Sequence, residues 1–250
     1  MTVTTSILVR VQAKGGKFLA DDIGGAEVMV RDALTGERLG GGLAQGTDSG
    51  NLASSYTAGA SPSVIVTPGD PPAVQWLVPD ETTSHLRLDL PICRPTLLEI
   101  SAWGPLGGLQ SAHRVTATQW IVPGQKLDQP PGFILLIPGL IVQVLSPPTH
   151  LTITSLPQTV SFEANVAMMC GCPIADGEPW LPADFDVTAS IGPAGQPADT
   201  VLPLAYTGTT SLFSGTWQVT QSGFYQAAVT AIQKSTGNTG TGTVTFFVKT

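Results

Sequence analysis

The stretch Gly223-Phe224-Tyr225-Gln226-Ala227-Ala228-Val229-Thr230-Ala231 places Tyr225, Ala227, Val229 and Ala231 at every second position. Side chains that alternate with a period of two predict a β-strand with one buried face. A turn sequence, Gly237-Asn238-Thr239-Gly240, follows it, and then a second alternating run, Val244-x-Phe246-x-Val248. The chain therefore closes in two strands joined by a turn.

Strands of the same kind are expected throughout the second half of the chain. Seven short strands separated by turn signals predict an immunoglobulin-like sandwich. The closing Gly-x-Tyr strand, Gly-Asn turn and final alternating strand also resemble bacterial immunoglobulin-like domains. The cysteine pair that bridges the sheets of antibody domains is missing, because no cysteine follows Cys172. The expected strands are 151–155, 159–169, 186–191, 201–206, 213–219, 223–231 and 242–248.

The first half opens with a different β pattern. Residues 6–13 alternate Ile7, Val9 and Val11 with Leu8, Arg10 and Gln12, which predicts a first strand. A second alternating strand at 25–32, a Thr35-Gly36 turn and a return at Leu39 follow. This order resembles the opening of the transthyretin-like or carboxypeptidase-regulatory-like β-sandwich. That resemblance implies a fold and by itself says nothing about an activity.

The chain is thus expected to be all-β, with two tandem β-sandwich domains. Residues 1–125 are predicted to form the transthyretin-like sandwich, with a long Gly-, Ser- and Pro-rich surface loop at 40–72 that holds one short strand near 63–67. Residues 126–149 are predicted to be a linker and crossover strand, and 150–250 the immunoglobulin-like sandwich. The apolar run 133–145 is too short to span a membrane, which takes about 20 residues.

Composition restricts the partners and the compartment. The net charge is −7 and the 11 basic residues are scattered, so we expect no nucleic-acid partner, because binding phosphates requires clustered Lys and Arg. Charged residues are only 12% of the chain, against about 25% in ordinary domains. Few charges with many Gly, Pro, Ser and Thr residues favour a periplasmic or secreted protein whose leader is absent from the sequence; a cytoplasmic location is the alternative.

Soft ligands converge after the strand predicted at 159–169. If the extended chain continues beyond this strand, Met168, Cys170 and Cys172 share one face. Thiolate and thioether ligands select Cu(I), zinc or iron–sulfur clusters. The absence of a nearby histidine and of a fourth ligand argues against tetrahedral zinc. Three interpretations stay open: a soft-metal site, with Cu(I) as the metal; a strained, redox-active disulfide; and inert thiols, one of them paired with Cys93.

The loop at 174–185 is the second candidate site. It carries the carboxylates Asp176, Glu178 and Asp184, but the spacing of a calcium loop is missing, so a solvated turn at Asp176-Gly177 is favoured. We expect Trp180 to be exposed on this loop and to serve as a binding anchor.

Catalytic signatures are missing from the sequence, which argues against an enzyme. There is no Gly-x-Ser-x-Gly, His-Glu-x-x-His or Gly-x-x-x-x-Gly-Lys-[Ser/Thr] motif, and His85, His113 and His150 are isolated. The leading hypothesis is an extracytoplasmic binding or assembly protein that contacts another protein or copies of itself. The alternatives are a Cu(I)-binding or thiol-redox protein, and a carbohydrate-binding or hydrolase accessory module with Trp103, Trp120 and Trp180 as stacking residues.

Overall fold

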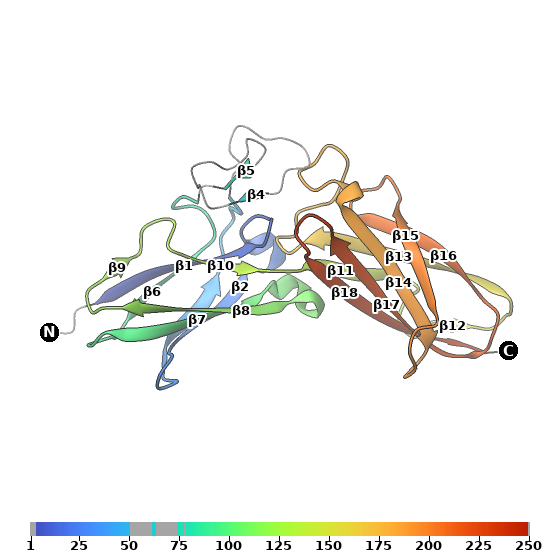
Figure 1. The fold of residues 1–250 in the computed structure, drawn as a ribbon, viewed down its shortest axis with the longest axis horizontal. Helices are drawn as coiled ribbons and strands as arrows, with labels where there is room; N and C mark the ends of the chain where they lie inside the picture. The colour runs from blue at the N-terminus through green and yellow to red at the C-terminus, as the bar shows by residue number, and fades with distance from the viewer. Residues whose placement is uncertain (1–3, 51–61, 64–74, 78, 250) are drawn as a thin grey trace. The chain divides into compact units, whose positions relative to one another are not determined.

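The computed structural model describes residues 4–50, 62–63, 75–77 and 79–249. The chain is all-β and divides into two compact units (Figure 1). The first unit consists of Met1–Pro138 with Met169–Cys172, and the second of Gly139–Met168 with Pro173–Thr250. The predicted strand-rich fold class is confirmed.

The first unit is a sandwich of two four-stranded sheets. In one sheet the order is β10-β1-β6, with β9 also pairing with β1, and in the other it is β3-β2-β7-β8. Two short strands, β4 and β5, pair separately. The elements are β1 (Thr5–Ala13), η1 (Asp21–Ile23), β2 (Ala26–Asp32), β3 (Arg38–Ala44), β4 (Pro62–Ser63), β5 (Gln75–Trp76), β6 (Leu86–Leu90), β7 (Thr96–Gly104), η2 (Leu106–Ser111), β8 (His113–Ile121), β9 (Lys126–Leu127) and β10 (Phe133–Ile137).

Strand β1 is the centre of its sheet and is buried on both faces. It pairs with β6 on one side and, in parallel, with β10 on the other. Its polar residues Arg10 and Gln12 are buried like Val9 and Val11. Loop segments cover the Arg10 side of β1 and accept hydrogen bonds from Arg10.

The hairpin β2–β3 begins the second sheet as the sequence predicts. The Asp32 carboxylate accepts hydrogen bonds from the backbone N–H groups of Leu34 and Thr35, and Gly36 takes a φ of 76°. The expected loop at 40–72 is wrong at its start, since residues 40–44 belong to β3. A Cβ atom on Gly42 would lie 3.1 Å from Leu86, so the glycines let this strand pack closely under β6. The rest of the expected loop lies outside the described residues, except 45–50 and 62–63.

The second unit is an immunoglobulin-like sandwich, as predicted. Its strands follow the order β11-β13-β16-β15-β14-β17-β18-β12, in which β15 pairs with both β16 and β14 and so joins the two layers. The elements are β11 (Leu140–Ser146), β12 (Thr152–Ile153), β13 (Gln158–Met168), η3 (Pro182–Asp184), β14 (Phe185–Pro193), β15 (Thr200–Tyr206), β16 (Leu212–Val219), β17 (Gly223–Gln233) and β18 (Thr239–Val248).

Aromatic side chains connect the two layers of this sandwich. Phe162 of β13 packs edge-on against Phe246 of β18, with ring centroids 6.3 Å apart, and Trp217 of β16 packs against Tyr225 of β17 at 5.3 Å. The Tyr225 hydroxyl donates a hydrogen bond to the backbone carbonyl of Gln221 at 3.1 Å. A tyrosine near the start of this strand that bonds back to the chain just before it is the tyrosine corner of immunoglobulin-like folds.

Among the described residues, no helix is long and apolar enough to cross a membrane. The apolar run 133–145 instead forms β10 and most of β11, which pair within the first and the second unit respectively.

Replacing Tyr225 with Phe should destabilise the second unit by about 1 kcal/mol, because the Gln221 carbonyl loses its donor while the ring packing stays. Urea unfolding followed by tryptophan fluorescence measures the change. The matched control is Tyr206→Phe, because no hydrogen bond of the Tyr206 hydroxyl is found among the described residues. Equal effects of the two substitutions would remove the tyrosine corner as a source of stability.

Candidate functional site

The cysteine segment lies in a turn rather than in an extended strand. Strand β13 ends at Met168, and Gly171 takes a φ of 75°. The condition under which Met168, Cys170 and Cys172 would share one face is not met, because a left-handed glycine reverses the chain and ends the alternation. Met168 belongs to the second unit, whereas Cys170 and Cys172 belong to the first.

The Cys170 side chain is enclosed by residues of the first unit. Its side chain is fully buried and its Sγ accepts a hydrogen bond from the backbone N–H of Lys17 at 3.4 Å. A Cβ atom on Gly16 would lie 3.1 Å from this sulfur, so the glycine provides the space for the thiol. All three cysteines are free thiols, with Cys93 exposed and Cys172 half-buried.

The two neighbouring thiols differ in acidity. Burial raises the pKa of Cys170, but hydrogen bonds from the Cys172 thiol and the Lys17 N–H outweigh burial and lower the pKa below its ordinary value. Donation of its proton to Cys170, together with burial, raises the pKa of Cys172. Cys170 is therefore the more acidic thiol of the pair.

A metal at this position would have few protein ligands. No group of three or more His, Cys, Asp or Glu side chains suited to a metal ion occurs in the described part of the chain. Cys170 and Cys172 supply two sulfurs, which suits a soft ion such as Cu(I) better than tetrahedral zinc. The soft-metal site, with Met168 as a further ligand, stays a prediction.

The candidate residues of the loop at 174–185 lie in different environments and do not form one site. Trp180 is 3% exposed, so its expected role as an exposed anchor is wrong: the side chain is buried, and the backbone carbonyl of Trp180 accepts the N–H of Ala175. Asp176 and Glu178 are exposed beside Gly177, which has a φ of 80°. Asp184 instead accepts hydrogen bonds from Gln233 and Ser235, and so holds the β17–β18 hairpin.

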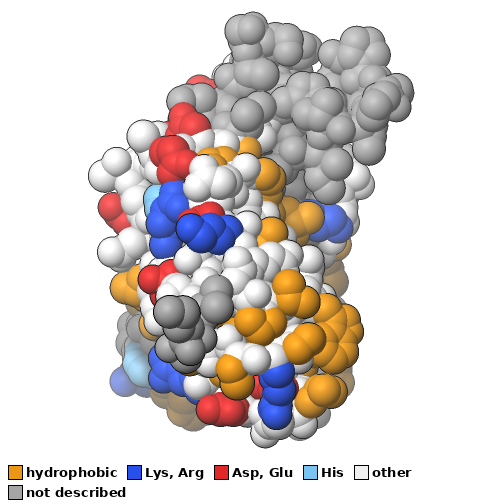
Figure 2. All heavy atoms as spheres, turned by 90° about the vertical axis from the view of Figure 1, so that its left-hand side faces the viewer, with side chains coloured by type: hydrophobic (Ala, Val, Ile, Leu, Met, Phe, Trp, Pro, Cys, Tyr) orange, Lys and Arg blue, Asp and Glu red, His pale blue; other side chains and the backbone are white. Residues whose placement is uncertain are grey.

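The remaining tryptophans of the accessory-module hypothesis lie on the outward face of the β7–β8 pair. Trp103 packs under the guanidinium of Arg114, whose Cζ lies 5.9 Å from the ring centroid. Trp120 is 58% exposed. Figure 2 shows hydrophobic side chains gathered on one side of the surface that it views, beside a few basic and acidic groups. The exposed large hydrophobic side chains among the described residues of the first unit are Leu34, Leu43, Leu109, Trp120, Val122 and Leu136.

A groove of about 350 Å³ lies beside β8 in the first unit. Its lining combines amide, apolar and proline side chains with one charge, the ammonium group of Lys126. Such a lining can donate hydrogen bonds to an oxygen-rich ligand, but the described lining side chains include no nucleophile or general base. The groove is lined by Gln119, Lys126, Leu127, Gln129, Pro130, Pro131, Gly132 and Phe133.

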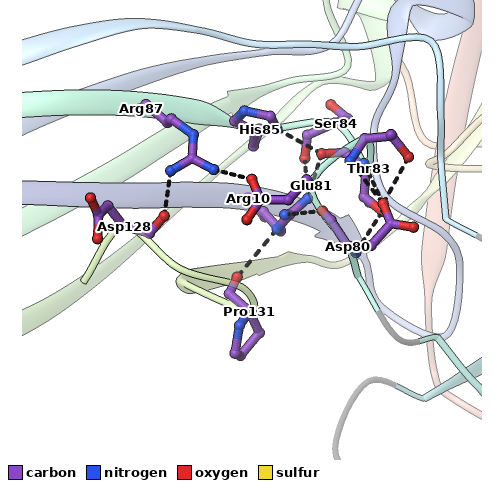
Figure 3. A network of polar contacts seen from close by, with 10 residues as sticks. Arg10, Asp80, Glu81, Thr83, Ser84, His85, Arg87, Asp128 and Pro131 are labelled. Carbon is purple, nitrogen blue, oxygen red and sulfur yellow. Dashed lines mark hydrogen bonds and ion pairs between the residues drawn. The ribbon is translucent and has the colours of Figure 1, made fainter. Parts of the chain in front are cut away.

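Two arginines of the first unit hold the wall of this groove (Figure 3). The guanidinium of Arg10 donates to the carbonyl of Pro131 at 3.2 Å, and Arg87 donates to the carbonyl of Asp128. A Cβ atom on Gly132 would lie 2.5 Å from the Leu8 carbonyl oxygen, so the loop lies directly against β1. The 128–132 segment is therefore a fixed wall.

Arg10 also fastens the segment that leads into β6. It is fully buried and donates to the carbonyls of Asp80, Thr83 and Ser84, while its guanidinium lies 5.9 Å from the ring of Phe18. Burial lowers the pKa of Arg10, and the charges of Glu81 and Asp80 oppose this shift. Alternation along 6–13 cannot reveal this role, since the carbonyls that Arg10 binds lie 70 to 121 residues away in sequence.

The outward face of the second unit's larger layer carries no charged side chain over most of its area. We call it the threonine face. The rings of Phe224 and Phe247 stack on it with centroids 4.4 Å apart, and Phe224 is 66% exposed. At the end of this face, Asp186 pairs with Lys234. The face comprises Thr188, Ser190, Val201, Pro203, Phe224, Gln226, Ala228, Thr230, Ile232, Thr239, Thr241, Thr243, Thr245 and Phe247.

Replacing Arg10 with Lys should destabilise the first unit by about 3 kcal/mol or more, because one ammonium group cannot reach all the buried carbonyls and each orphaned acceptor costs about 1 to 3 kcal/mol. Chemical denaturation measures the loss. The matched control is Arg87→Lys; Arg87 is part-exposed, and its ion pair with Glu81 is worth about 1 kcal/mol or less. A loss at Arg10 no larger than that at Arg87 would contradict the assigned role.

No family model and no curated protein matches the chain. Three solved structures show a weak similarity to it. An engineered protein is 19% identical over 47% of this chain and 22% of its own, with a TM-score of 0.33. Fibronectin(III)-like modules of Clostridium thermocellum CbhA are 9% identical over 89% of this chain and 77% of their own, with a TM-score of 0.31. A titin fragment is 10% identical over 100% of this chain and 92% of its own, with a TM-score of 0.25. Scores this low assign neither a family nor a function.

Proposed function

We propose that this chain is a non-enzymatic binding or assembly protein that acts outside the cytoplasm and contacts another protein through the threonine face. The observation that carries the proposal is the chemistry of that face. Protein interfaces are depleted of charged side chains at their centre and enriched in aromatic ones. A sheet surface with an exposed, stacked phenylalanine pair and no charge among its central residues has this composition.

Exposure supports the same interpretation. Phe224, Val201 and Ile232 are 66%, 65% and 44% exposed, and all three lie on this face. An apolar surface of this kind, surrounded by polar threonines, is typical of protein contact sites. The proposed location rests on composition, with charged residues at 12% and many Gly, Pro, Ser and Thr residues. Fractionation of the source cells that recovers the protein in the cytosol would contradict the location.

Replacing Phe224 with Lys should abolish capture of the partner, because a charge at the centre of the interface loses its hydration without gaining a counter-charge. Affinity capture from the native source followed by quantitative mass spectrometry measures the loss, with a reduction of about tenfold or more expected. The matched control is Leu34→Lys, since Leu34 is 72% exposed but lies in the β2–β3 turn of the first unit. A wild-type protein that captures no partner overturns the proposal, as does equal loss with both variants.

The thiol pair Cys170–Cys172 favours a second candidate function, soft-metal binding or thiol redox chemistry. The Cys170 sulfur accepts a hydrogen bond from the Lys17 backbone N–H and its pKa lies below the ordinary value, which favours a thiolate at this position. That thiolate is a ligand for Cu(I). In the redox alternative, a disulfide oxidant takes up two electrons while the two Sγ atoms form a bond and release two protons.

Titration with Cu(I) in competition with a chromophoric chelator should detect about one bound ion per chain, and Cys170→Ser should abolish binding. Cys93→Ser is the control, because Cys93 is exposed and distant in sequence. In parallel, peptide mapping after incubation with oxidised glutathione tests for a Cys170–Cys172 disulfide. No copper binding and three free thiols after oxidation would contradict this second candidate.

A further inference from the structure

We propose that β8 is a homodimerisation edge, at which two copies of this chain pair antiparallel about a two-fold axis at Ala117. The β8 edge is a surface of the first unit, separate from the threonine face, and it adds a second copy of the chain as a partner. Three properties of β8 point to this pairing: an unprotected edge, exposed inward side chains and a self-complementary sequence.

Strand β8 forms the end of the order β3-β2-β7-β8 and pairs only with β7 among the described residues. It is nine residues long, contains no proline and one charged residue, Arg114, which lies against Trp103, and it pairs with β7 in a continuous register. Natural proteins protect such edges with short strands, bulges, prolines or charges. The other described edges of this unit have such protection: β3 has three glycines and a register shift, β6 is five residues with Arg87 and Asp89, and β10 is five residues before Pro138.

Two side chains in the middle of β8 that point toward the inside of the sandwich are left exposed. Their neighbours on β7, Leu98 and Ile100, are 0% and 1% exposed, whereas Gln119 and Ala117 on β8 are exposed. The open strip continues into the groove beside β8, which Gln119 lines. A further strand added at this edge would cover the strip.

The sequence of β8 complements itself when the axis passes through Ala117. Residues opposite each other then have numbers that sum to 234, so Thr116 faces Thr118, Val115 faces Gln119, and Arg114 faces Trp120 of the second copy. Threonine pairs and cation–π pairs across strands are both stabilising. Arg114 already lies against its own Trp103, so its guanidinium would sit between two indole rings.

Charge supports a second copy as the occupant. The chain carries a net charge of −7, so most surfaces of two copies repel each other. Strand β8 has no acidic residue, and its one arginine faces an indole ring instead of another arginine. Edge pairing over nine residues is a small interface, so we expect a dissociation constant of about 1 to 100 µM.

Cross-linking tests the register. In a Cys93→Ser background, Ala117→Cys should form a disulfide-linked dimer, because the two substituted residues lie directly opposite each other. The matched control Thr118→Cys should cross-link at least about tenfold less, because each residue 118 faces residue 116 of the second copy and lies diagonal to its own equivalent. Equal or greater cross-linking at 118 overturns the register, and no cross-linking at either position overturns the dimer.

Reciprocal charge substitution tests the Arg114–Trp120 contact by sedimentation velocity on the full chain. Arg114→Glu and Trp120→Lys should each weaken dimerisation about tenfold or more. The double variant should restore it, because the introduced carboxylate then faces the introduced ammonium group of the second copy at both ends of the strand pair. Phe224→Lys should leave the dimer unchanged.

Three outcomes overturn the proposal. The first is a wild-type protein that stays monomeric at a concentration well above the expected dissociation constant. The second is a double variant that fails to recover dimerisation. The third is a dimer lost with Phe224→Lys, which would instead assign self-association to the threonine face.

Discussion

The first unit depends on the buried guanidinium of Arg10. Because β1 is covered on both faces, water does not reach the Arg10 side chain. Its N–H groups must therefore donate to acceptors within the protein. Carbonyls of three segments supply them, at residues 80, 83–84 and 131. The same bonds that satisfy the arginine therefore fix the approach to β6 and the wall of the groove beside β8.

The second unit obtains its stability differently. No buried ionic group was found among its described residues; aromatic rings from β13, β16, β17 and β18 fill the space between its layers. Alternation in β17 and β18 places Tyr225 and Phe246 inward, and the same alternation leaves Phe224 and Phe247 stacked outside. The inward set explains the fold, and the outward set provides a surface for a partner.

Periodicity predicts most of the strands because one buried face imposes it. It fails where both faces of a strand are buried, as at Arg10, and where glycine packs under a neighbouring strand, as at Gly42. Trp180 was expected outside because it lies in a polar loop, yet its ring is buried. A shared face for Met168, Cys170 and Cys172 required an extended chain, and the φ of Gly171, which ends the extension, could not be inferred from alternation. The exposed edge of β8 depends on the order of strands in space, which local sequence does not contain.

The pairing of β1 with β10 also affects how the protein is made. Val9 lies beside Phe133 and Ala13 beside Ile137, so β1 pairs with a strand that is synthesised more than a hundred residues later. Contacts of such long sequence separation form slowly, since the intervening chain must first be ordered. During synthesis β1, with its row of apolar side chains and its arginine, has only part of its sheet available. Until β10 has been synthesised, the apolar side chains and one edge of β1 stay uncovered in the nascent chain. Exposed surface of this kind is where chaperones protect folding chains from aggregation.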